Sequence, residues 1–374
     1  MRGFGGVYAN QPVLVTGETG FKGTWLACWL HELGARVTGI ALAPPTDPSL
    51  HAQADLGSIV PHRHGDIRDP SVLSNAIDEL RPRMIFHLAA QAVVRDSYSD
   101  PMGTIATNVM GTAHLLDAVR RSKWPCAVVV ITSDKCYRER EQPQGYREGD
   151  PLGGGDPYSA SKACAEIVTA AFRQAFFSPD RIGEHGFAVA SVRAGNVLGP
   201  GDWARDRIVP DCVRFLTQDR PIQVRNPEAL RPWQHVLEPL SGYLWLGARL
   251  LSPGAARHCD AWNFGPRPDS CRPVREVVEE FIRAWGEGTW ECLAEQSPPP
   301  EAHVLRLNID KTIAELDWRP VWEFGQMIER TAHGYGRLGM ASTDPEAVRE
   351  LLSQEIAAYT TAAAAAGVAW AKDA

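Results

Sequence analysis

The sequence lacks the hallmarks of several protein classes. No segment reaches the roughly 18 consecutive apolar residues of a membrane-spanning helix, and the first ten residues contain no apolar core of a secretion signal. The chain has no run of Lys or Arg and a formal net charge of −7, so it offers no electrostatic attraction to nucleic acid or to an acidic membrane surface. We therefore expect a cytoplasmic protein that binds neither.

Closely spaced cysteines are also missing. The eight cysteines are scattered, with no C-x-x-C pair and no His/Cys cluster at the spacing of a zinc site, so we expect reduced, mostly buried thiols and no metal. The 374 residues, 44% of them hydrophobic and 22% charged, are enough to bury a large core. This length favours one large domain or two intimate ones.

A glycine-rich turn follows the first apolar run, in PVLVTGETGFKGTWLACWLHELGARVTGIAL. The pattern predicts a strand, a helix that ends near Gly34, and a second strand. Gly17, Gly20 and Gly23 lie at the first turn, where a missing Cβ lets backbone amides approach a pyrophosphate at the positive end of the helix. The context predicts a dinucleotide site, although a tight packing turn is the simpler alternative.

Further strand-like runs predict the fold class. RPRMIFHLAA, WPCAVVVITS and FAVASVRAGNV are separated by amphipathic stretches such as GTAHLLDAVRRS, which predicts an α/β, Rossmann-type doubly wound parallel sheet. From about residue 199, Pro and Trp become frequent and the alternation fades. We expect a dinucleotide-binding domain over residues 1–198, with a returning segment near 222–265, and a smaller, mixed, interleaved C-terminal substrate domain over 199–374. The chain should end in a helix with a Ser/Thr cap and a frayed, alanine-rich tail.

Two short motifs carry candidate catalytic groups. In VITSDKCY, Ser133, Asp134 and Lys135 follow a predicted strand, at the edge where such sheets bind ligands. In DPYSASK, Tyr158 and Lys162 share one helix face, and an ammonium beside the phenol should lower the tyrosine pKa from about 10 toward the range of a general base. Alone, the second pair is also typical of a helix surface, and Asp134 with Lys135 of a structural ion pair. Together with the glycine turn, the motifs favour catalysis.

These residues carry a family resemblance over nearly the whole chain. TGETGFKGTWL, FHLAAQAVVRDSYSDP, TNVMGT, TSDKCY and PLGGGDPYSASK resemble the extended short-chain dehydrogenase/reductases. The Lys of SDK and the blocks RAGNVLGPGDWARDRIVPD and RPWQHVLEPL are narrower and are similar to the CDP-glucose 4,6-dehydratases. One residue departs from the family: Glu18 stands where a histidine is expected. Its carboxylate would either weaken cofactor binding or point to solvent.

The resemblance implies a lyase reaction in deoxysugar biosynthesis. NAD would take the C4 hydride of CDP-glucose, water would leave across C5 and C6, and the hydride would return to C6. Tyr158 would remove the C4 hydroxyl proton, Lys162 would hold the phenolate and the nicotinamide ribose, and Ser133 would donate to the sugar oxygen. Asp134 would be the acid at C6. Lys135 stands where related dehydratases have a glutamate base, and it would need a pKa depressed by burial and by nearby Lys162.

The remaining candidates bind ligands. Besides Tyr158 and Lys162, the expected cofactor-binding residues lie in the glycine turn and after two further strands: Gly17, Gly20, Phe21, Lys22, Gly23, Asp66, Ile67, Leu88, Ala89 and Gln91. Asp66 would accept from the adenine amino group, with an ordinary loop aspartate as the alternative. The expected substrate residues are Asn196 for the sugar hydroxyls, Arg207 and Arg231 for the diphosphate, and Trp233 and His235, which are also typical of a core.

The residues alone leave open the choice between NAD and NADP and two alternative functions. The acid that usually binds the NAD ribose is missing from GIALAPP, and no arginine for NADP replaces it, so the choice of NAD rests on the resemblance. A 4-epimerase or ketoreductase would use the Ser-Tyr-Lys set without Asp134 and Lys135, and a non-catalytic NAD sensor would need neither Tyr158 nor Lys162. The resemblance also implies a homodimer through helices near residues 103–120 and 157–176.

Overall fold

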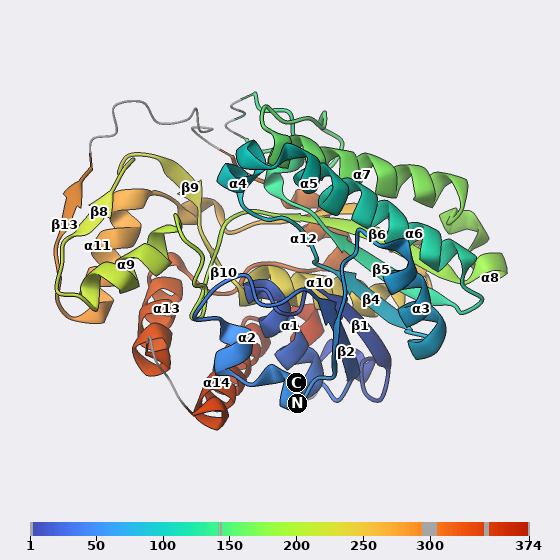
Figure 1. The fold of residues 1–374 in the computed structure, drawn as a ribbon, viewed down its shortest axis with the longest axis horizontal. Helices are drawn as coiled ribbons and strands as arrows, with labels where there is room; N and C mark the ends of the chain where they lie inside the picture. The colour runs from blue at the N-terminus through green and yellow to red at the C-terminus, as the bar shows by residue number, and fades with distance from the viewer. Residues whose placement is uncertain (1–2, 141, 143, 294–304, 340–343, 373–374) are drawn as a thin grey trace.

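A parallel seven-stranded sheet forms the centre of the molecule (Figure 1). The computed structural model describes residues 3–140, 142, 144–293, 305–339 and 344–372. The strand order is β11-β6-β5-β4-β1-β2-β3, and every pairing is parallel. The strands span Pro12–Thr16 (β1), Arg36–Ala41 (β2), His62–His64 (β3), Met84–His87 (β4), Cys126–Ile131 (β5), Phe187–Ala194 (β6) and Ala261–Phe264 (β11).

Helices cover both faces of this sheet, since its central strands are apolar on both sides. One face carries α1 (Phe21–Glu32), α10 (Leu237–Leu250) and α14 (Pro345–Ala365). The other carries α3 (Pro70–Leu80), α6 (Gly111–Arg121) and α7 (Pro157–Ala175). The shorter helices are α2 (Leu50–Gln53), α4 (Val94–Ser99), α5 (Pro101–Ile105), α8 (Ile182–His185) and α12 (Asp310–Leu316).

A smaller lobe packs beside the sheet. Its helices are α9 (Ile208–Leu216), α11 (Val274–Trp285) and α13 (Phe324–Leu338), and they share a separate core (Figure 1). Three short strand pairs join it, two parallel and one antiparallel: β7 (Val197–Leu198) with β10 (Gln234–His235), β8 (Ile222–Val224) with β13 (Trp290–Cys292), and β9 (Leu230–Pro232) with β12 (Cys271–Pro273). The predicted fold class is therefore confirmed.

The chain crosses between the sheet and the smaller lobe more than once. After the lobe begins, α10 and β11 return to the sheet, and α14 packs against α1. The division into residues 1–198 and 199–374 stays a prediction. Within the range 222–265, β8 and β9 pair with strands of the smaller lobe, whereas α10 and β11 pack with the central sheet.

The C-terminal segment differs from its prediction. Asp344, not a Ser or Thr, caps α14 by accepting from the backbone of Glu346 and Ala347. The helix runs through the alanine tract, and a 3-10 turn (Ala369–Ala371) follows it. Trp370 is 1% exposed and stacks on Phe4 at a centroid distance of 4.7 Å. The tail is ordered rather than frayed because this ring fills part of the core.

Two further expectations can be compared with the described residues. All eight cysteines are free, and five are buried, which confirms the prediction of reduced, mostly buried thiols. Among the helices that the structure describes, none combines the length and the apolar character needed to cross a bilayer.

Candidate active site

The glycine turn after β1 is shaped by close backbone contacts. Gly17 has φ +78°, and a Cβ there would lie 2.7 Å from the backbone of Ala89. A Cβ on Gly23 would lie 2.1 Å from the carbonyl oxygen of Gly17. Gly20 is the N-cap of α1, where Phe21 and Lys22 form the first turn. The turn therefore fits a dinucleotide pyrophosphate, whose phosphates need bare backbone at a helix N-terminus.

The segment after β4 lies directly beside this turn. Leu88 donates its backbone N–H to the carbonyl of Thr16 at 3.0 Å, and the N–H of Ala89 bonds to the Thr16 hydroxyl at 3.2 Å. Gln91 is held by Asn108, which accepts from its N–H at 2.9 Å and donates to its carbonyl at 3.0 Å. The structure thus brings Leu88 and Ala89 to the glycine turn through backbone contacts. Their contact with the dinucleotide stays a prediction.

Asn108 itself was not predicted. Its amide also donates to Ser161 on α7 at 2.8 Å, so it fastens the Gln91 segment to the helix of Tyr158 and Lys162. The residue lies in a π-helical turn, Ala106–Met110, between α5 and α6. Such turns are frequent at functional sites. Its one sequence signal is its place in the quoted stretch TNVMGT, since the contacts join segments far apart in the chain.

Asp66 and Ile67, which follow β3, are less available for cofactor binding than expected. Both carboxylate oxygens of Asp66 accept from the Arg68 guanidinium, at 2.5 to 3.1 Å, and this partner holds the pKa of Asp66 below its usual range. Contact with an adenine amino group would have to compete with Arg68. Ile67 is 4% exposed and packs beneath Gly111, so its side chain belongs to the core.

Ser133, Tyr158 and Lys162 meet in a buried cluster at the carboxyl end of β5. Ser133 follows that strand, and the two other residues lie on the first turns of α7. Ser133 hydrogen-bonds to the Tyr158 phenol, and Lys162 Nζ lies 6.0 Å from the centroid of the tyrosine ring. The predicted spacing therefore places all three groups together.

The prediction of a lowered tyrosine pKa is wrong for the chain alone. Burial raises the pKa of Tyr158 to about 12, and the bond to Ser133 opposes this only in part. Burial and the neighbouring Lys22 also lower the pKa of Lys162, to about 8. Desolvation of the phenolate outweighs the nearby cations. The phenol of the chain alone is therefore protonated at neutral pH.

Asp134 is the buried member of the Asp134–Lys135 pair. It is 5% exposed, accepts from the Ser133 hydroxyl at 2.9 Å, and lies against Gly195, where a Cβ would come within 2.8 Å of its carboxylate. Burial raises its pKa, while the cations of Lys135 and Lys22 oppose that shift. A raised pKa suits a carboxyl group that donates a proton.

The two lysines near Asp134 differ from the sequence expectation. Lys135 is half-buried, so it lacks the full burial that its expected role as a base presumes. Lys22, expected only to bind the cofactor, has its pKa lowered to about 8 by burial and by Arg207. The sequence did not indicate this meeting of Lys22 with Asp134, because residues 22 and 134 belong to different βα units.

A second unpredicted residue braces the site. Glu166 lies one helical turn after Lys162 and is 2% exposed. Its carboxylate accepts from Thr132 at 2.5 Å, from Ser191 at 2.7 Å and from Arg193 at 2.8 Å. Glu166 thereby joins α7 to the ends of β5 and β6. Its i, i+4 spacing from Lys162 was the available signal.

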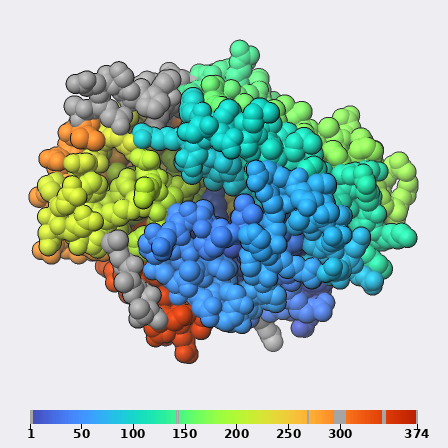
Figure 2. Space-filling model, viewed as in Figure 1, coloured from blue at the N-terminus to red at the C-terminus, as the bar shows by residue number. Residues whose placement is uncertain are grey.

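The expected sugar and diphosphate residues differ in their exposure. Figure 2 shows a hollow where the N-terminal part, the α4–α5 segment and the smaller lobe meet. Asn196 follows β6 and is exposed. Arg207 is half-buried, pairs with Asp202 at 2.6 Å and influences the pKa of Tyr158. Arg231, on β9, is half-buried and donates to the carbonyl of Leu230 at 2.9 Å.

Trp233 and His235 lie in the core instead. Trp233 is 5% exposed and donates to the carbonyl of Arg272 at 2.9 Å. His235 is fully buried between Trp25 and Trp322, and burial lowers its pKa to about 3. These contacts agree with packing, the alternative that their setting beside proline also allowed. A role of either side chain in binding the substrate stays a prediction.

Glu18 does not point to solvent. Its side chain is 1% exposed and hydrogen-bonds to His62 of β3. Gly39 of β2 leaves it room, because a Cβ there would lie 2.2 Å from the Glu18 carboxyl carbon. Of the two alternatives for Glu18, the outward carboxylate is therefore excluded. Burial against β2 and β3 removes the side chain from the surface.

Comparisons with known proteins agree with this arrangement. The model of the family GDP-mannose 4,6 dehydratase matches residues 14–246. The chain is 49% identical over 323 residues to CDP-glucose 4,6-dehydratase of Salmonella typhimurium, which covers 86% of this chain and 90% of that protein. It is 26% identical to dTDP-glucose 4,6-dehydratase of Xanthomonas campestris, over 86% of this chain and 92% of that protein.

Solved structures share the fold. DesIV, a dTDP-glucose 4,6-dehydratase from Streptomyces venezuelae solved with NAD and TYD bound, has a TM-score of 0.71 at 24% identity, over 87% of this chain and 96% of that one. UDP-glucuronic acid 4-epimerase from Bacillus cereus, solved with UDP-glucuronic acid and NAD, has a TM-score of 0.73 at 21% identity, over 87% and 99%. At these identities the likeness concerns the fold alone.

Proposed function

The chain belongs to the GDP-mannose 4,6 dehydratase family, and from this membership we propose that it is an NAD-dependent hydro-lyase that converts CDP-glucose to CDP-4-keto-6-deoxyglucose. Such a product serves deoxysugar biosynthesis. The choice of CDP is supported by the higher identity to the Salmonella typhimurium enzyme than to the dTDP-glucose dehydratase. Tyr158, Lys162, Ser133, Asp134 and Lys135 form the proposed catalytic set.

One observation carries the proposal: buried Asp134 lies beside Ser133 in the cluster of Tyr158 and Lys162. An epimerase or ketoreductase needs the Ser-Tyr-Lys set but no additional acid, whereas water loss needs one. A sensor without chemistry needs neither group. Asp134, whose pKa burial raises, supplies an acid at the place where a 4,6-dehydratase requires it.

The chain offers a fitting site for NAD. The bare glycine turn and the backbone of Leu88 and Ala89 would hold the pyrophosphate side, while Lys162 would hold the nicotinamide ribose. When bound, NAD supplies hydride acceptance at C4 and hydride return at C6. The residues of the chain supply the proton transfers that accompany these two events.

Oxidation at C4 requires a base for the hydroxyl proton. Tyr158 takes this proton as phenolate, with Ser133 donating to the sugar oxygen. The anion of Asp134 raises the pKa of Tyr158, and the cation of Arg207 lowers it. A protonated Asp134 therefore assists the phenolate, so one state of the site prepares both the base for the first step and the acid for the second.

Water loss requires an acid at C6 and a base at C5. Asp134 donates its proton to the departing C6 hydroxyl group. Lys135 adjoins Asp134 and handles the C5 proton in this proposal, which requires the neutral amine. Lys22 also faces Asp134, and its pKa of about 8 leaves part of it neutral near pH 7. Variants at the two lysines separate their roles.

Arg207 and Arg231 would bind the diphosphate of the substrate. Arg207 precedes α9 and Arg231 lies on β9, and both are half-buried. Their guanidinium groups can bind phosphate oxygens with two hydrogen bonds each. Asn196, exposed after β6, would bond to sugar hydroxyls. Asp202 keeps Arg207 in place through its 2.6 Å contact.

A homodimer in the cytoplasm completes the proposal. Six large apolar side chains on α4, α5, the π-helical turn after α5, and α7 with its C-cap are exposed, and we call them the α4–α7 apolar face: Tyr98, Met102, Ile105, Met110, Ile167 and Phe176. Met102 is 72% exposed and Ile167 is 55% exposed. Apolar side chains gathered on one face are typical of a protein interface, which supports pairing of two copies through these helices.

The purified chain tests the proposal directly. Incubation with NAD and CDP-, dTDP-, UDP- or GDP-glucose, followed by product identification, should give a 4-keto-6-deoxy sugar from CDP-glucose. Turnover of the other nucleotides should be far weaker, since groups that bond to cytosine are left unpaired by another base. Equal kcat/KM for dTDP-glucose would overturn the substrate assignment. A C4-epimer or a reduced sugar as product would overturn the reaction.

A further inference from the structure

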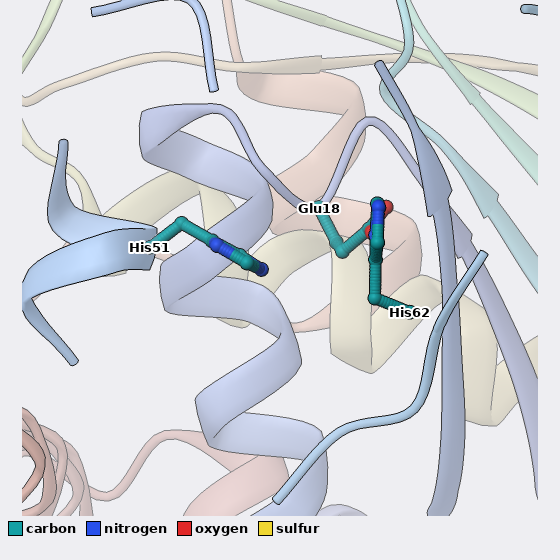
Figure 3. Close-up of side chains that lie close together, drawn as sticks. All are labelled: Glu18, His51 and His62. Carbon is teal, nitrogen blue, oxygen red and sulfur yellow. The ribbon is translucent and has the colours of Figure 1, made fainter. Parts of the chain in front are cut away.

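Three side chains that play no part in the proposed reaction converge beneath the glycine turn. Glu18 comes from the turn before α1, His51 from α2 and His62 from β3, and their side chains point toward one another (Figure 3). One ligand atom from each lies within 4.8 Å of the others. The imidazole rings of His51 and His62 are 5.9 Å apart between centroids.

The carboxylate of Glu18 is incompletely satisfied. Oε1 bonds to Nδ1 of His62, but Oε2 is buried and has no hydrogen-bond partner among the described residues. Nε2 of His51 is likewise buried, and it too has no hydrogen-bond partner among the residues that the structure describes. A buried carboxylate oxygen without a partner is costly. Both unpartnered atoms belong to one cluster, so a single ligand could satisfy them together.

The donor set identifies the class of that ligand. Two imidazole nitrogens and one carboxylate are the protein ligands of many open zinc sites, with water as the fourth ligand. Hard cations such as Mg²⁺ and Ca²⁺ prefer oxygen ligands throughout. A tetrahedral zinc ion with bonds of about 2.0 Å keeps its ligand atoms about 3.4 Å apart. The cluster spans at most 4.8 Å, so small side-chain rotations would suffice.

We propose that Glu18, His51 and His62 form a binding site for one divalent transition-metal cation of the zinc class. Spacing along the chain hides this site, because Glu18 and His62 are 44 residues apart. The proposal also gives a reason for a buried carboxylate in the glycine turn. The ion would tie the turn to β3 and α2.

Titration of the metal-stripped, NAD-loaded full chain tests the site. Co²⁺ is the probe, because its visible spectrum reports coordination, and Zn²⁺ should displace it. One ion per chain should bind, with bands typical of nitrogen and oxygen ligands rather than thiolate. Mg²⁺ should not compete. Absence of stoichiometric Co²⁺ binding by the wild-type chain would overturn the proposal.

Matched variants locate the bound ion. His51→Ala and Glu18→Gln should each weaken Co²⁺ binding by roughly a hundredfold or more, whereas His64→Ala, at the exposed end of the same β3 strand, should bind as the wild type does. Circular dichroism checks folding, and His51→Ala, on the short helix α2, remains informative if Glu18→Gln misfolds. Unchanged Co²⁺ binding by folded His51→Ala would show that the ion sits elsewhere and would refute the site.

Discussion

At the scale of single residues, proton positions decide what the site can do. Asp134 and Tyr158 both have raised pKa values because both are buried, and the anion of one disfavours the anion of the other. Their titrations are therefore coupled. With Asp134 protonated, Tyr158 loses its proton more readily.

The first prediction separates elimination from oxidation. Lys135→Met and Asp134→Asn should slow water loss roughly 100- to 10,000-fold, the usual effect of a lost acid or base, while C4 oxidation continues. Enzyme-bound NADH should then accumulate in rapid-mixing absorbance measurements. Tyr158→Phe is the control, because it removes the first base and should prevent NADH formation altogether.

A structural ion pair predicts a different pattern for the same variants. Either substitution would then lower thermal stability and impair both steps together. Solvent deuterium exchange at C5 distinguishes the lysines: loss of exchange in Lys135→Met assigns the C5 proton to Lys135. If that variant dehydrates at the wild-type rate and Lys22→Met does not, the base is Lys22.

The second prediction concerns Lys22, whose buried charge should lower the free energy of unfolding. Its pKa is about 8 in the folded chain against 10.5 ordinarily, so the unfolded chain binds more protons between those values and stability rises with pH across that window. Below pH 8 the charged amine is destabilising. Lys22→Met should therefore stabilise the NAD-free chain at pH 7 by about 1–3 kcal/mol, after allowance for its partial exposure.

Urea unfolding at pH 7 and pH 10 measures this effect. The advantage of Lys22→Met should shrink toward pH 10, where the wild-type amine is neutral when folded. Lys372→Met, at an exposed position near the C-terminus, serves as the control and should change stability by less than about 0.5 kcal/mol. A destabilised Lys22→Met variant at pH 7 would contradict the prediction.

Local spacing explains which residues could be predicted. The glycine turn and the Tyr158–Lys162 pair each lie within one βα unit, so a few neighbouring residues reveal them. Asn108 and the partners of Glu18 were not visible, because each contact joins units far apart in the chain. The predicted direction of the Tyr158 pKa shift was wrong for a related reason. The burial that raises this pKa depends on the whole fold, whereas the lysine four residues away can be read directly from the sequence.

At the scale of elements, the strand and helix pattern was the most predictable part. Central strands such as β5 are continuous apolar runs because both faces are covered. The end of the chain was less predictable. An alanine tract has no amphipathic pattern, and the core position of Trp370 depends on Phe4, some 360 residues earlier, which stacks on it.

The third prediction tests the α4–α7 apolar face. Met102→Glu combined with Ile167→Glu places charges on the proposed dimer face, where like charges would face each other across a symmetric contact. Light scattering coupled to size exclusion should show monomers in place of dimers. Ile313→Glu, at a 46% exposed position on α12, is the control and should leave the dimer intact. A wild-type chain that is monomeric would contradict the proposal.

The fourth prediction concerns the ordered tail. Trp370→Ala removes a ring that stacks on Phe4 and packs on Tyr359, and should lower the free energy of unfolding by about 3–5 kcal/mol. Thermal or urea unfolding measures it, with Lys372→Ala as the neighbouring control. Wild-type stability in Trp370→Ala would mean that the tail is frayed after all.

At the scale of the whole molecule, the proposed reaction consumes no net NAD, because the cofactor is oxidised again in the same catalytic cycle. The fifth prediction follows: deuterium placed at C4 of CDP-glucose should appear at C6 of the same product molecule, because the hydride removed is the hydride returned. Mass spectrometry of a mixture of labelled and unlabelled substrate shows whether transfer stays within one molecule. Stoichiometric release of NADH would instead indicate an ordinary dehydrogenase.

The stacking of Phe4 on Trp370 has a topological consequence. It brings together two residues close to the first and last described positions, in the region where Figure 1 marks both termini. The described polypeptide path is therefore nearly a closed ring. A short linker joining the ends would close that ring, and new ends opened at the exposed turn around Pro253 and Gly254 would leave the order of strands in space unchanged. The fold should thus tolerate circular permutation, with new termini placed at this exposed turn.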